Sequence, residues 1–214
     1  MNNKLKAPCR TAVLIAAAAL AGLTAARQTE AQTMASLPRP SYPVEALGEA
    51  RPLLAWIDFC NRYPGECGVD RTEPALIALT PRVWQTIISV NRRVNAAIRP
   101  VTDLDHWGVP DRWDLAEDGQ GDCEDFQLLK RRLLAEAGLP RRAMRMTVVV
   151  DDKGEGHAVL MIRTAQGDFV LDNKTSAILP WHQTGYVFVK RESQNGVGWV
   201  SLGRAVSPTA TANP

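Results

Sequence analysis

The sequence predicts an α+β domain in which N-terminal helices precede an antiparallel β-sheet. Apolar residues recur at helical spacing in three segments before residue 138. From residue 144 onward, short runs rich in β-branched residues alternate with turn residues. Helices that come first and strands that come later, rather than in alternation, are typical of the α+β class.

The composition is that of a globular domain and excludes several other classes. The chain has 214 residues, of which 45% are hydrophobic and 22% charged, and its formal net charge is +2. A charge this close to zero gives no basic surface of the kind that nucleic-acid-binding proteins need, so nucleic acid is not an expected partner. Inside the body of the chain, no apolar run reaches the roughly 20 residues of a membrane-spanning helix.

The N-terminus has the pattern of a secretory signal peptide. Lys4, Lys6 and Arg10 precede an uncharged stretch rich in Ala and Leu, from Thr11 to Ala26. We expect cleavage after Ala26 and a periplasmic or secreted protein, with an uncleaved membrane anchor as the alternative. The expected organisation is a signal peptide (1–26), a linker (27–43), the folded domain (44–204) and a disordered tail (205–214).

Three helices are predicted before the sheet. The first, over residues 52–60, has apolar side chains at positions i, i+3, i+4 and i+7. The second begins at Pro81, after Thr80 as its N-cap, and ends near Pro100. The third, over residues 122–137, carries apolar residues on one face. Its basic triplet Lys130-Arg131-Arg132 is expected to form a solvated face.

Between the second and third helices, residues 100–121 show no periodicity but contain two Trp and five Asp, so they are predicted to form a structured loop. After the third helix the period changes to that of strands. Turn residues at 151–154 and 165–167 make the first three strands a β-meander. The predicted strands span residues 144–150, 157–163, 168–171, 186–190 and 199–203.

The four cysteines have different expected fates. Cys9 lies within the signal peptide. Cys60 and Cys67 flank a turn-rich hexapeptide, so in an oxidising compartment a local disulfide between them is the simplest expectation. Metal binding by this pair is the weaker hypothesis, because zinc sites have three or four protein ligands. Cys123 is then left over as a reactive thiol, although its pairing with one of the other two stays open.

Cys123 lies at the start of the third helix, within Gly121-Asp122-Cys123-Glu124-Asp125. The helix N-terminus lowers the pKa of a thiol, and its N–H groups can bind an oxyanion. Asp122, Glu124 and Asp125 oppose this effect, because negative neighbours raise the pKa. A catalytic thiol at this position therefore requires a cation, which could be a protonated histidine, a metal or both.

His157 opens the second predicted strand and Asp172 ends the third, so antiparallel pairing would place them side by side. With Cys123 they would supply a nucleophile, a base and an orienting carboxylate. The plainer interpretations are a small filler residue for Cys123, a partly buried structural histidine for His157 and a turn residue for Asp172.

Together these motifs resemble those of the bacterial transglutaminase-like cysteine peptidases, of which the LapG-type periplasmic proteases are the best known. The resemblance covers about residues 53–190. It is carried by residues 121–125 with the helix that follows, by His157-Ala158-Val159-Leu160, and by Val170-Leu171-Asp172-Asn173. Further parts of it are Trp107-Gly108 with Asp111 and Trp113, and the two-cysteine element at Cys60 and Cys67, which is typical of an exported branch of the family.

The resemblance implies a papain-like fold of the transglutaminase type and a role for each site residue. Cys123 would be the nucleophile, His157 the general base and Asp172 the group that orients the imidazole. The resemblance also implies a Ca²⁺ site at Asp122 and Glu124, with Asp125 as a further ligand. Carboxylate oxygens suit this hard dication, which would offset the negative charge around the thiol.

The first functional hypothesis is an exported, Ca²⁺-assisted cysteine endopeptidase. By analogy with the LapG-type branch, its substrate would be a large cell-surface adhesin cut during biofilm release, and its regulator an inner-membrane receptor. A second hypothesis is a transglutaminase or amidase with the same triad. A third is a catalytically silent module that binds a peptide or glycan.

Overall fold

The computed structural model describes residues 36–208, 210 and 211. The predicted signal peptide and the first part of the predicted linker lie outside the described residues. Within this part of the chain, no helix is both long enough and apolar enough to cross a membrane.

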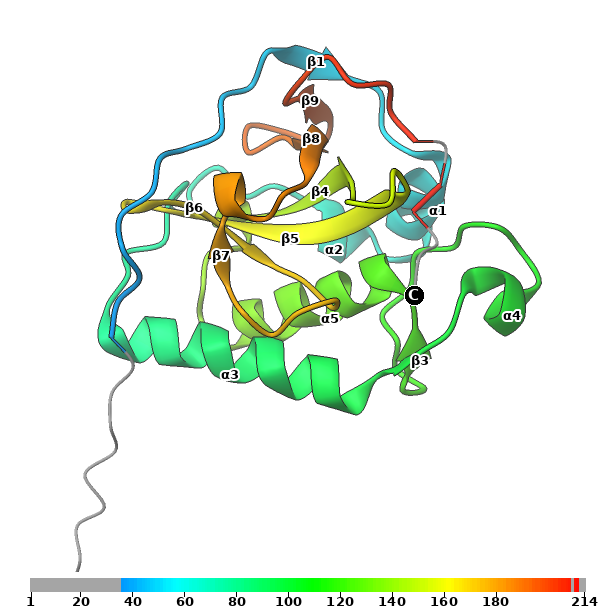
Figure 1. Ribbon diagram of the computed structural model, residues 1–214, viewed down its shortest axis with the longest axis horizontal. Coiled ribbons are helices and arrows are strands. Elements are labelled where there is room, and N and C mark those ends of the chain that lie inside the picture. The colour runs from blue at the N-terminus through cyan, green and yellow to red at the C-terminus, as the bar shows by residue number, and fades with distance from the viewer. Residues whose placement is uncertain (1–35, 209, 212–214) are drawn as a thin grey trace, which may run out of the picture. The chain divides into compact units, whose positions relative to one another are not determined.

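A seven-stranded antiparallel sheet forms the centre of the described domain, in the order β1-β9-β8-β4-β5-β6-β7 (Figure 1). A separate two-stranded parallel pair joins β2 and β3 just before the third predicted helix. The strands are β1 (Gly48–Ala50), β2 (Arg99–Pro100), β3 (Gln120–Gly121), β4 (Met144–Val150), β5 (Gly156–Thr164), β6 (Gly167–Leu171), β7 (Leu179–Pro180), β8 (Val187–Glu192) and β9 (Trp199–Ser201).

Helices cover one face of this sheet, with α5 packed on β5 and α3 packed on α5 (Figure 1). The larger apolar core lies in this layer, where Phe126 and Leu134 of α5 meet Leu160 of β5. The predicted α+β class is therefore confirmed. The helices are α1 (Leu54–Arg62), α2 (Pro64–Cys67), α3 (Pro81–Ala97), α4 (Asp103–Trp107), α5 (Cys123–Glu136) and the short 3₁₀ turns at Arg141–Ala143 and Trp181–Gln183.

Local signals in the sequence explain where the helices begin. The hydroxyl of Thr80 accepts a hydrogen bond from the backbone N–H of Val83, and Pro81 occupies the first helical position of α3. The structured loop predicted over 100–121 contains the five-residue helix α4, which Thr102 caps through the N–H of Asp105. A single turn is too short to show a helical period, so the sequence pattern did not reveal it.

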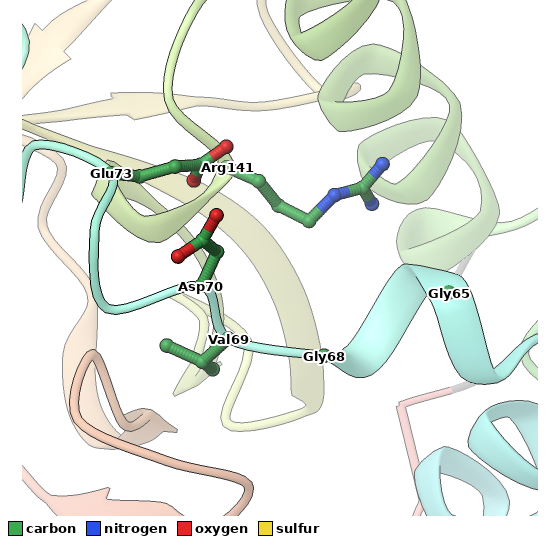
Figure 2. A pocket seen from close by; sticks show the side chains of 6 residues that line it. All are labelled: Gly65, Gly68, Val69, Asp70, Glu73 and Arg141. Carbon is green, nitrogen blue, oxygen red and sulfur yellow. The ribbon is translucent and has the colours of Figure 1, made fainter.

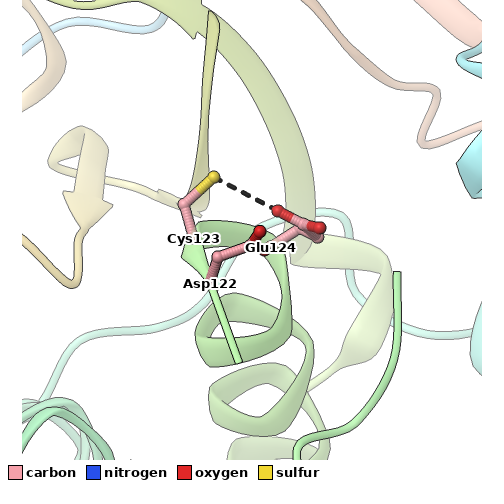
Figure 3. Close-up of side chains that lie close together, drawn as sticks. All are labelled: Asp122, Cys123 and Glu124. Carbon is pink, nitrogen blue, oxygen red and sulfur yellow. Dashed lines mark hydrogen bonds between the residues drawn. The ribbon is translucent and has the colours of Figure 1, made fainter. Parts of the chain in front are cut away.

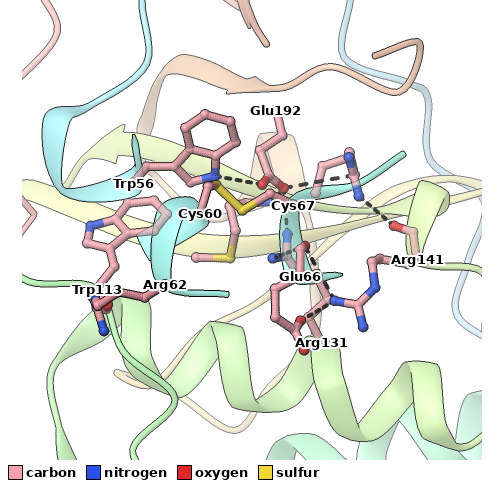
Figure 4. Close-up of a disulfide and its surroundings, with 11 residues drawn as sticks. Trp56, Cys60, Arg62, Glu66, Cys67, Trp113, Arg131, Arg141 and Glu192 are labelled. Carbon is pink, nitrogen blue, oxygen red and sulfur yellow. Dashed lines mark hydrogen bonds and ion pairs between the residues drawn. A yellow bond between two sulfur atoms is a disulfide. The ribbon is translucent and has the colours of Figure 1, made fainter. Parts of the chain in front are cut away.

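The expected solvated face on α5 is wrong for Lys130 and Arg131, which are both fully buried. Arg131 is buried because it forms an ion pair with Glu192 of β8, at 2.7 Å, and donates to the carbonyl of Glu66 at 2.9 Å (Figure 4). Arg132 is half-buried and also contacts Glu66. The helix is enclosed on several sides, so its basic residues find partners inside the domain.

Cys60 and Cys67 form a disulfide that joins the end of α1 to the end of α2, with 5.6 Å between their Cα atoms (Figure 4). The same region is tied to the sheet, because the Trp56 indole N–H donates to Glu192 at 2.8 Å. Disulfide, ion pair and indole together hold the N-terminal helices against the core.

Both flanking segments contact the domain where the structure describes them. Before β1, the N–H of Val44 donates to Asp168 at 2.9 Å, and Val44 joins a smaller apolar cluster on the other face of the sheet. Of the segment 205–214, which was expected to be disordered, the structure describes 205–208, 210 and 211. Within it, Thr211 is fully buried.

Candidate active site

Cys123 is the first residue of α5, with Asp122 as the N-cap. Asp125 completes a capping box, since one of its carboxylate oxygens accepts from the backbone N–H of Asp122 at 3.4 Å. Its other oxygen accepts from the N–H of Asp114 at 2.6 Å. Gly121 is needed just before this turn, because a Cβ there would lie 2.5 Å from the Asp125 carboxylate. The sequence Gly-Asp-Cys-Glu-Asp thus builds the helix start that carries the thiol.

The thiol of Cys123 is fully buried and faces the beginning of β5. Its sulfur accepts a hydrogen bond from the backbone N–H of Ala158 at 3.3 Å. It also lies 3.2 Å from a carboxylate oxygen of Glu124 (Figure 3). Because Ala158 directly follows His157, this contact brings the imidazole-bearing strand against the end of α5.

His157 and Asp172 meet as the strand pairing predicts. Nε2 of His157 lies 2.9 Å from Oδ1 of Asp172, and both side chains are buried. Among the described residues, Nδ1 of His157 has no hydrogen-bond partner. With Nε2 donating to the carboxylate, Nδ1 is the nitrogen with a lone pair that can accept a proton.

Asp172 is held in its ionised form by several donors. Burial opposes its charge, but hydrogen bonds and charge from His157, with the Tyr186 hydroxyl at 2.6 Å, hold the pKa of Asp172 below its ordinary value. In the sequence, Tyr186 is only the first residue of a predicted strand. Nothing in the pattern around it indicates a contact with Asp172, since the contact depends on how the loop before β8 returns across the sheet.

The backbone beside Asp172 is anchored from both helices of the covering layer. Lys130 of α5 donates to its carbonyl oxygen at 2.9 Å, and Asn95 of α3 donates to the same oxygen at 2.9 Å. Burial lowers the pKa of Lys130 to about 7. These residues position the end of β6 and with it the orienting carboxylate.

Five carboxylates gather beside the thiol and form what we call the acidic cluster: Asp103, Asp111, Asp122, Glu124 and Asp125. Within three overlapping groups of these residues and Cys123, potential ligand atoms lie within 4.8 Å of one another. Burial raises the pKa of Asp111 to about 6 and that of Asp122 to about 7, with the charges of neighbouring carboxylates adding to the effect. The pKa of Glu124 is raised well above its ordinary value, again chiefly by burial.

The acidic cluster has the properties of a cation site. Asp103, Asp122 and Glu124 each have one buried carboxylate oxygen without a hydrogen-bond partner among the described residues. Unsatisfied buried oxygens of this kind suit a hard divalent cation such as Ca²⁺. Asp125 is less suited, because both of its oxygens already accept backbone hydrogen bonds. Asp103 was missed in the sequence, where it is one of five Asp in a segment without a period.

The structure also has a surface pocket of about 420 Å³ between α2 and the residues that follow α5 (Figure 2). None of the residues that line it belongs to the acidic cluster or to the Cys123, His157 and Asp172 group. Its one basic side chain, Arg141, is already paired with Glu66. This pocket is therefore separate from the candidate site.

The chain matches the model of one known protein family. The model of the family described as bacterial transglutaminase-like cysteine proteinase matches residues 47–206, which is more than half of the chain. The chain belongs to this family. It is accordingly a transglutaminase-like cysteine peptidase with the fold of that family, and of the three functional hypotheses this supports the peptidase.

Among solved structures, this cysteine peptidase is similar to LapG of Legionella pneumophila. The calcium-bound form is 26% identical, with a TM-score of 0.49, over 60% of this chain and 74% of the other. An EGTA-treated form is 25% identical, with a TM-score of 0.48, over 61% and 72% of the two chains. No curated protein sequence matches the chain.

Proposed function

We propose that this cysteine peptidase cleaves a protein substrate with Cys123 as nucleophile, His157 as general base and Asp172 as the residue that orients the imidazole. One observation carries the proposal: Nε2 of His157 is bonded to Asp172, while Nδ1 is unpartnered among the described residues and lies on the strand that contacts the sulfur. Nucleophile, base and orienting carboxylate in this order are the elements of acyl-transfer catalysis.

In the reaction, Nδ1 of His157 takes the thiol proton and the thiolate attacks the carbonyl carbon of the scissile peptide bond. The positive end of the α5 dipole and the N–H groups at its start stabilise the negative charge that develops on sulfur and on the carbonyl oxygen. The imidazolium then protonates the leaving amine as the C–N bond breaks. Water, deprotonated by His157, attacks the thioester, releases the acid and restores the thiol.

We further propose that the acidic cluster binds Ca²⁺ through Asp122, Glu124 and Asp103. A bound Ca²⁺ would supply positive charge next to the thiolate. The need for it follows from Glu124, which contacts the sulfur at 3.2 Å and would repel a thiolate if ionised and unneutralised. The three unpartnered carboxylate oxygens support the assignment, and the calcium-bound LapG relative is consistent with it.

The signal-peptide pattern supports export to the periplasm or beyond, with cleavage after Ala26. By analogy with LapG-type proteases we propose a large cell-surface adhesin as the substrate and an inner-membrane receptor as the regulator. This part of the proposal rests on the resemblance, since no contact in the described residues selects one protein substrate over another.

Incubation of the purified protein with surface proteins released from the host cell tests the proposed function. We expect new peptide N-termini, mapped by mass spectrometry, that are absent with Cys123→Ala and reduced by at least about a hundredfold with His157→Gln. Adding EGTA should suppress them and restoring Ca²⁺ should recover them. Retention of full cleavage by Cys123→Ala would refute the assignment.

A labelled primary amine added to the same reaction separates hydrolysis from amine transfer. Free carboxyl termini on the products support the peptidase. Label incorporated into the substrate in place of hydrolysis would make the enzyme a transglutaminase. Glu136→Gln serves as a matched surface control, because this exposed acid at the end of α5 lies outside the acidic cluster.

A further inference from the structure

The chain's own C-terminal segment lies against the thiol. After β9 the chain runs back toward the start of α5, where its red end approaches that helix in Figure 1. The carbonyl oxygen of Thr211 is 2.5 Å from the sulfur of Cys123, and the thiol donates to it. Both Thr211 and Cys123 are fully buried. The position beside the nucleophile is thus filled by a peptide carbonyl.

Thr211 is held by its side chain as well as by its backbone. Its hydroxyl accepts from the indole N–H of Trp113 at 3.1 Å and lies 3.3 Å from Asp111 and 3.5 Å from Glu124. Its backbone N–H donates to the same Asp111 oxygen at 3.3 Å. Every polar group of this one residue therefore has a partner among residues that surround the nucleophile.

Gly156 provides a second, independent indication that the C-terminal segment packs beside the candidate site. A Cβ at this position would collide with the carbonyl oxygen of Ala210 and would lie 2.7 Å from the Pro208 side chain. The φ of Gly156 lies outside the left-handed region, so its backbone conformation does not itself require glycine. The residue before His157 is small because the tail passes directly over it.

The tail after residue 206 also lies beyond the residues that match the family model. The family match ends at residue 206 and the last strand of the sheet ends at Ser201. Pro208, Ala210 and Thr211 consequently add nothing to the sheet. Their contacts are with the residues around the nucleophile.

We propose that Thr211, with the described neighbours Pro208 and Ala210, is an internal ligand of the active site, bound where the acyl side of a peptide substrate binds and displaced before substrate enters. The inference rests on the proposed function of Cys123. The thiol that would attack a substrate carbonyl contacts the carbonyl oxygen of Thr211. The surrounding groups fit a small side chain with a hydroxyl, since an indole donor and carboxylate acceptors face it. Substrate affinity is reduced by the fraction of molecules in which the tail is bound.

The test measures the rate at which iodoacetamide alkylates Cys123 at pH 7, together with peptidase activity. Removal of residues 207–214 should raise the alkylation rate by about tenfold or more, because the thiol becomes accessible. Thr211→Val keeps the shape of the side chain but loses its hydroxyl contacts, and should raise the rate several-fold. Val206→Ala is the matched control, because this side chain is 90% exposed and should leave the rate unchanged.

Gly156→Ala separates tail displacement from damage to the site. In the intact chain it should raise the alkylation rate, because the added methyl group expels the tail. In the truncated chain it should have no effect. A synthetic peptide with the sequence of residues 206–211 should slow alkylation of the truncated protein, and the same peptide with Val in place of Thr211 should do so less.

Equal alkylation rates for the intact and truncated proteins would overturn the inference, as would a peptide without effect on the truncated protein. The outcome is independent of whether Cys123 cleaves peptides. Faster alkylation after truncation without any proteolysis would leave the tail as a ligand and refute the proposed function. If truncation changed neither the alkylation rate nor proteolysis, the proposed function would stand and the tail would not be a ligand of the site.

Discussion

Lys130 makes the energetics of the buried layer behind the active site testable. This lysine is fully buried in α5, and burial lowers its pKa to about 7 from an ordinary value of 10.5. Between these two values the unfolded chain holds the proton and the folded protein does not. Stability therefore rises with pH across this window, and below pH 7 the folded state bears the full cost of the buried charge.

The magnitude follows from the two pKa values. Each pH unit between them is equivalent to about 1.4 kcal/mol, so the cost below pH 7 amounts to about 5 kcal/mol. Lys130→Met removes this cost but also removes the hydrogen bonds to the Asp172 carbonyl and to Gln127, which costs about 2 to 3 kcal/mol. We expect the variant to be more stable than the wild type by about 2 kcal/mol at pH 6.5 and less stable by about 1 kcal/mol at pH 9.5.

Guanidinium denaturation followed by tryptophan fluorescence measures both proteins across this pH range. Lys153→Met is the matched control, because this lysine is exposed and should show the same pH dependence as the wild type. A difference in unfolding free energy between wild type and Lys130→Met that stayed constant from pH 6.5 to pH 9.5 would show that Lys130 does not have a lowered pKa in the folded state.

Three further predictions concern the site and its support. In EGTA, Asp122→Asn should be more stable than the wild type at pH 8 but not at pH 3.5. The folded pKa of Asp122, about 7, lies above the ordinary value of 3.8, so the cost of the buried charge accumulates as the pH rises between these two values. Thermal melts at both pH values check this. Tyr186→Phe should lower kcat by about threefold to tenfold with little change in KM, since the bond to Asp172 is lost. Steady-state kinetics would contradict this by showing a change in KM alone. Replacing Cys60 and Cys67 by Ser should lower the unfolding free energy by about 2 to 3 kcal/mol, measured by urea denaturation, and an unchanged midpoint would show that the disulfide contributes nothing.

The sequence predicted the fold class because the periods of helix and strand are local properties. The start of α5 could be predicted from Gly121, Asp122 and Asp125, which form its turn and capping box. The meeting of His157 and Asp172 followed from two adjacent antiparallel strands, whose register is limited by their short connection.

Burial of basic and acidic side chains was not predictable in the same way. Lys130 and Arg131 have the pattern of a solvated helix face, and only the packing of α3, β8 and the disulfide region around α5 encloses them. Asp103 and Asp111 come from a segment without a period, and the loop geometry brings them to the thiol. Such residues have no local signal, since their partners lie far away in the sequence.

The order of helices and strands, the helix start that carries Cys123 and the chemical types of the three residues proposed for catalysis can all be inferred from local sequence. The carboxylates that gather at the start of α5, the donors that hold Asp172 and the position of Thr211 depend on the tertiary fold. Capping, turns and periodicity act over only a few residues. Burial, pKa and access to the nucleophile depend on segments that the folded chain alone brings together.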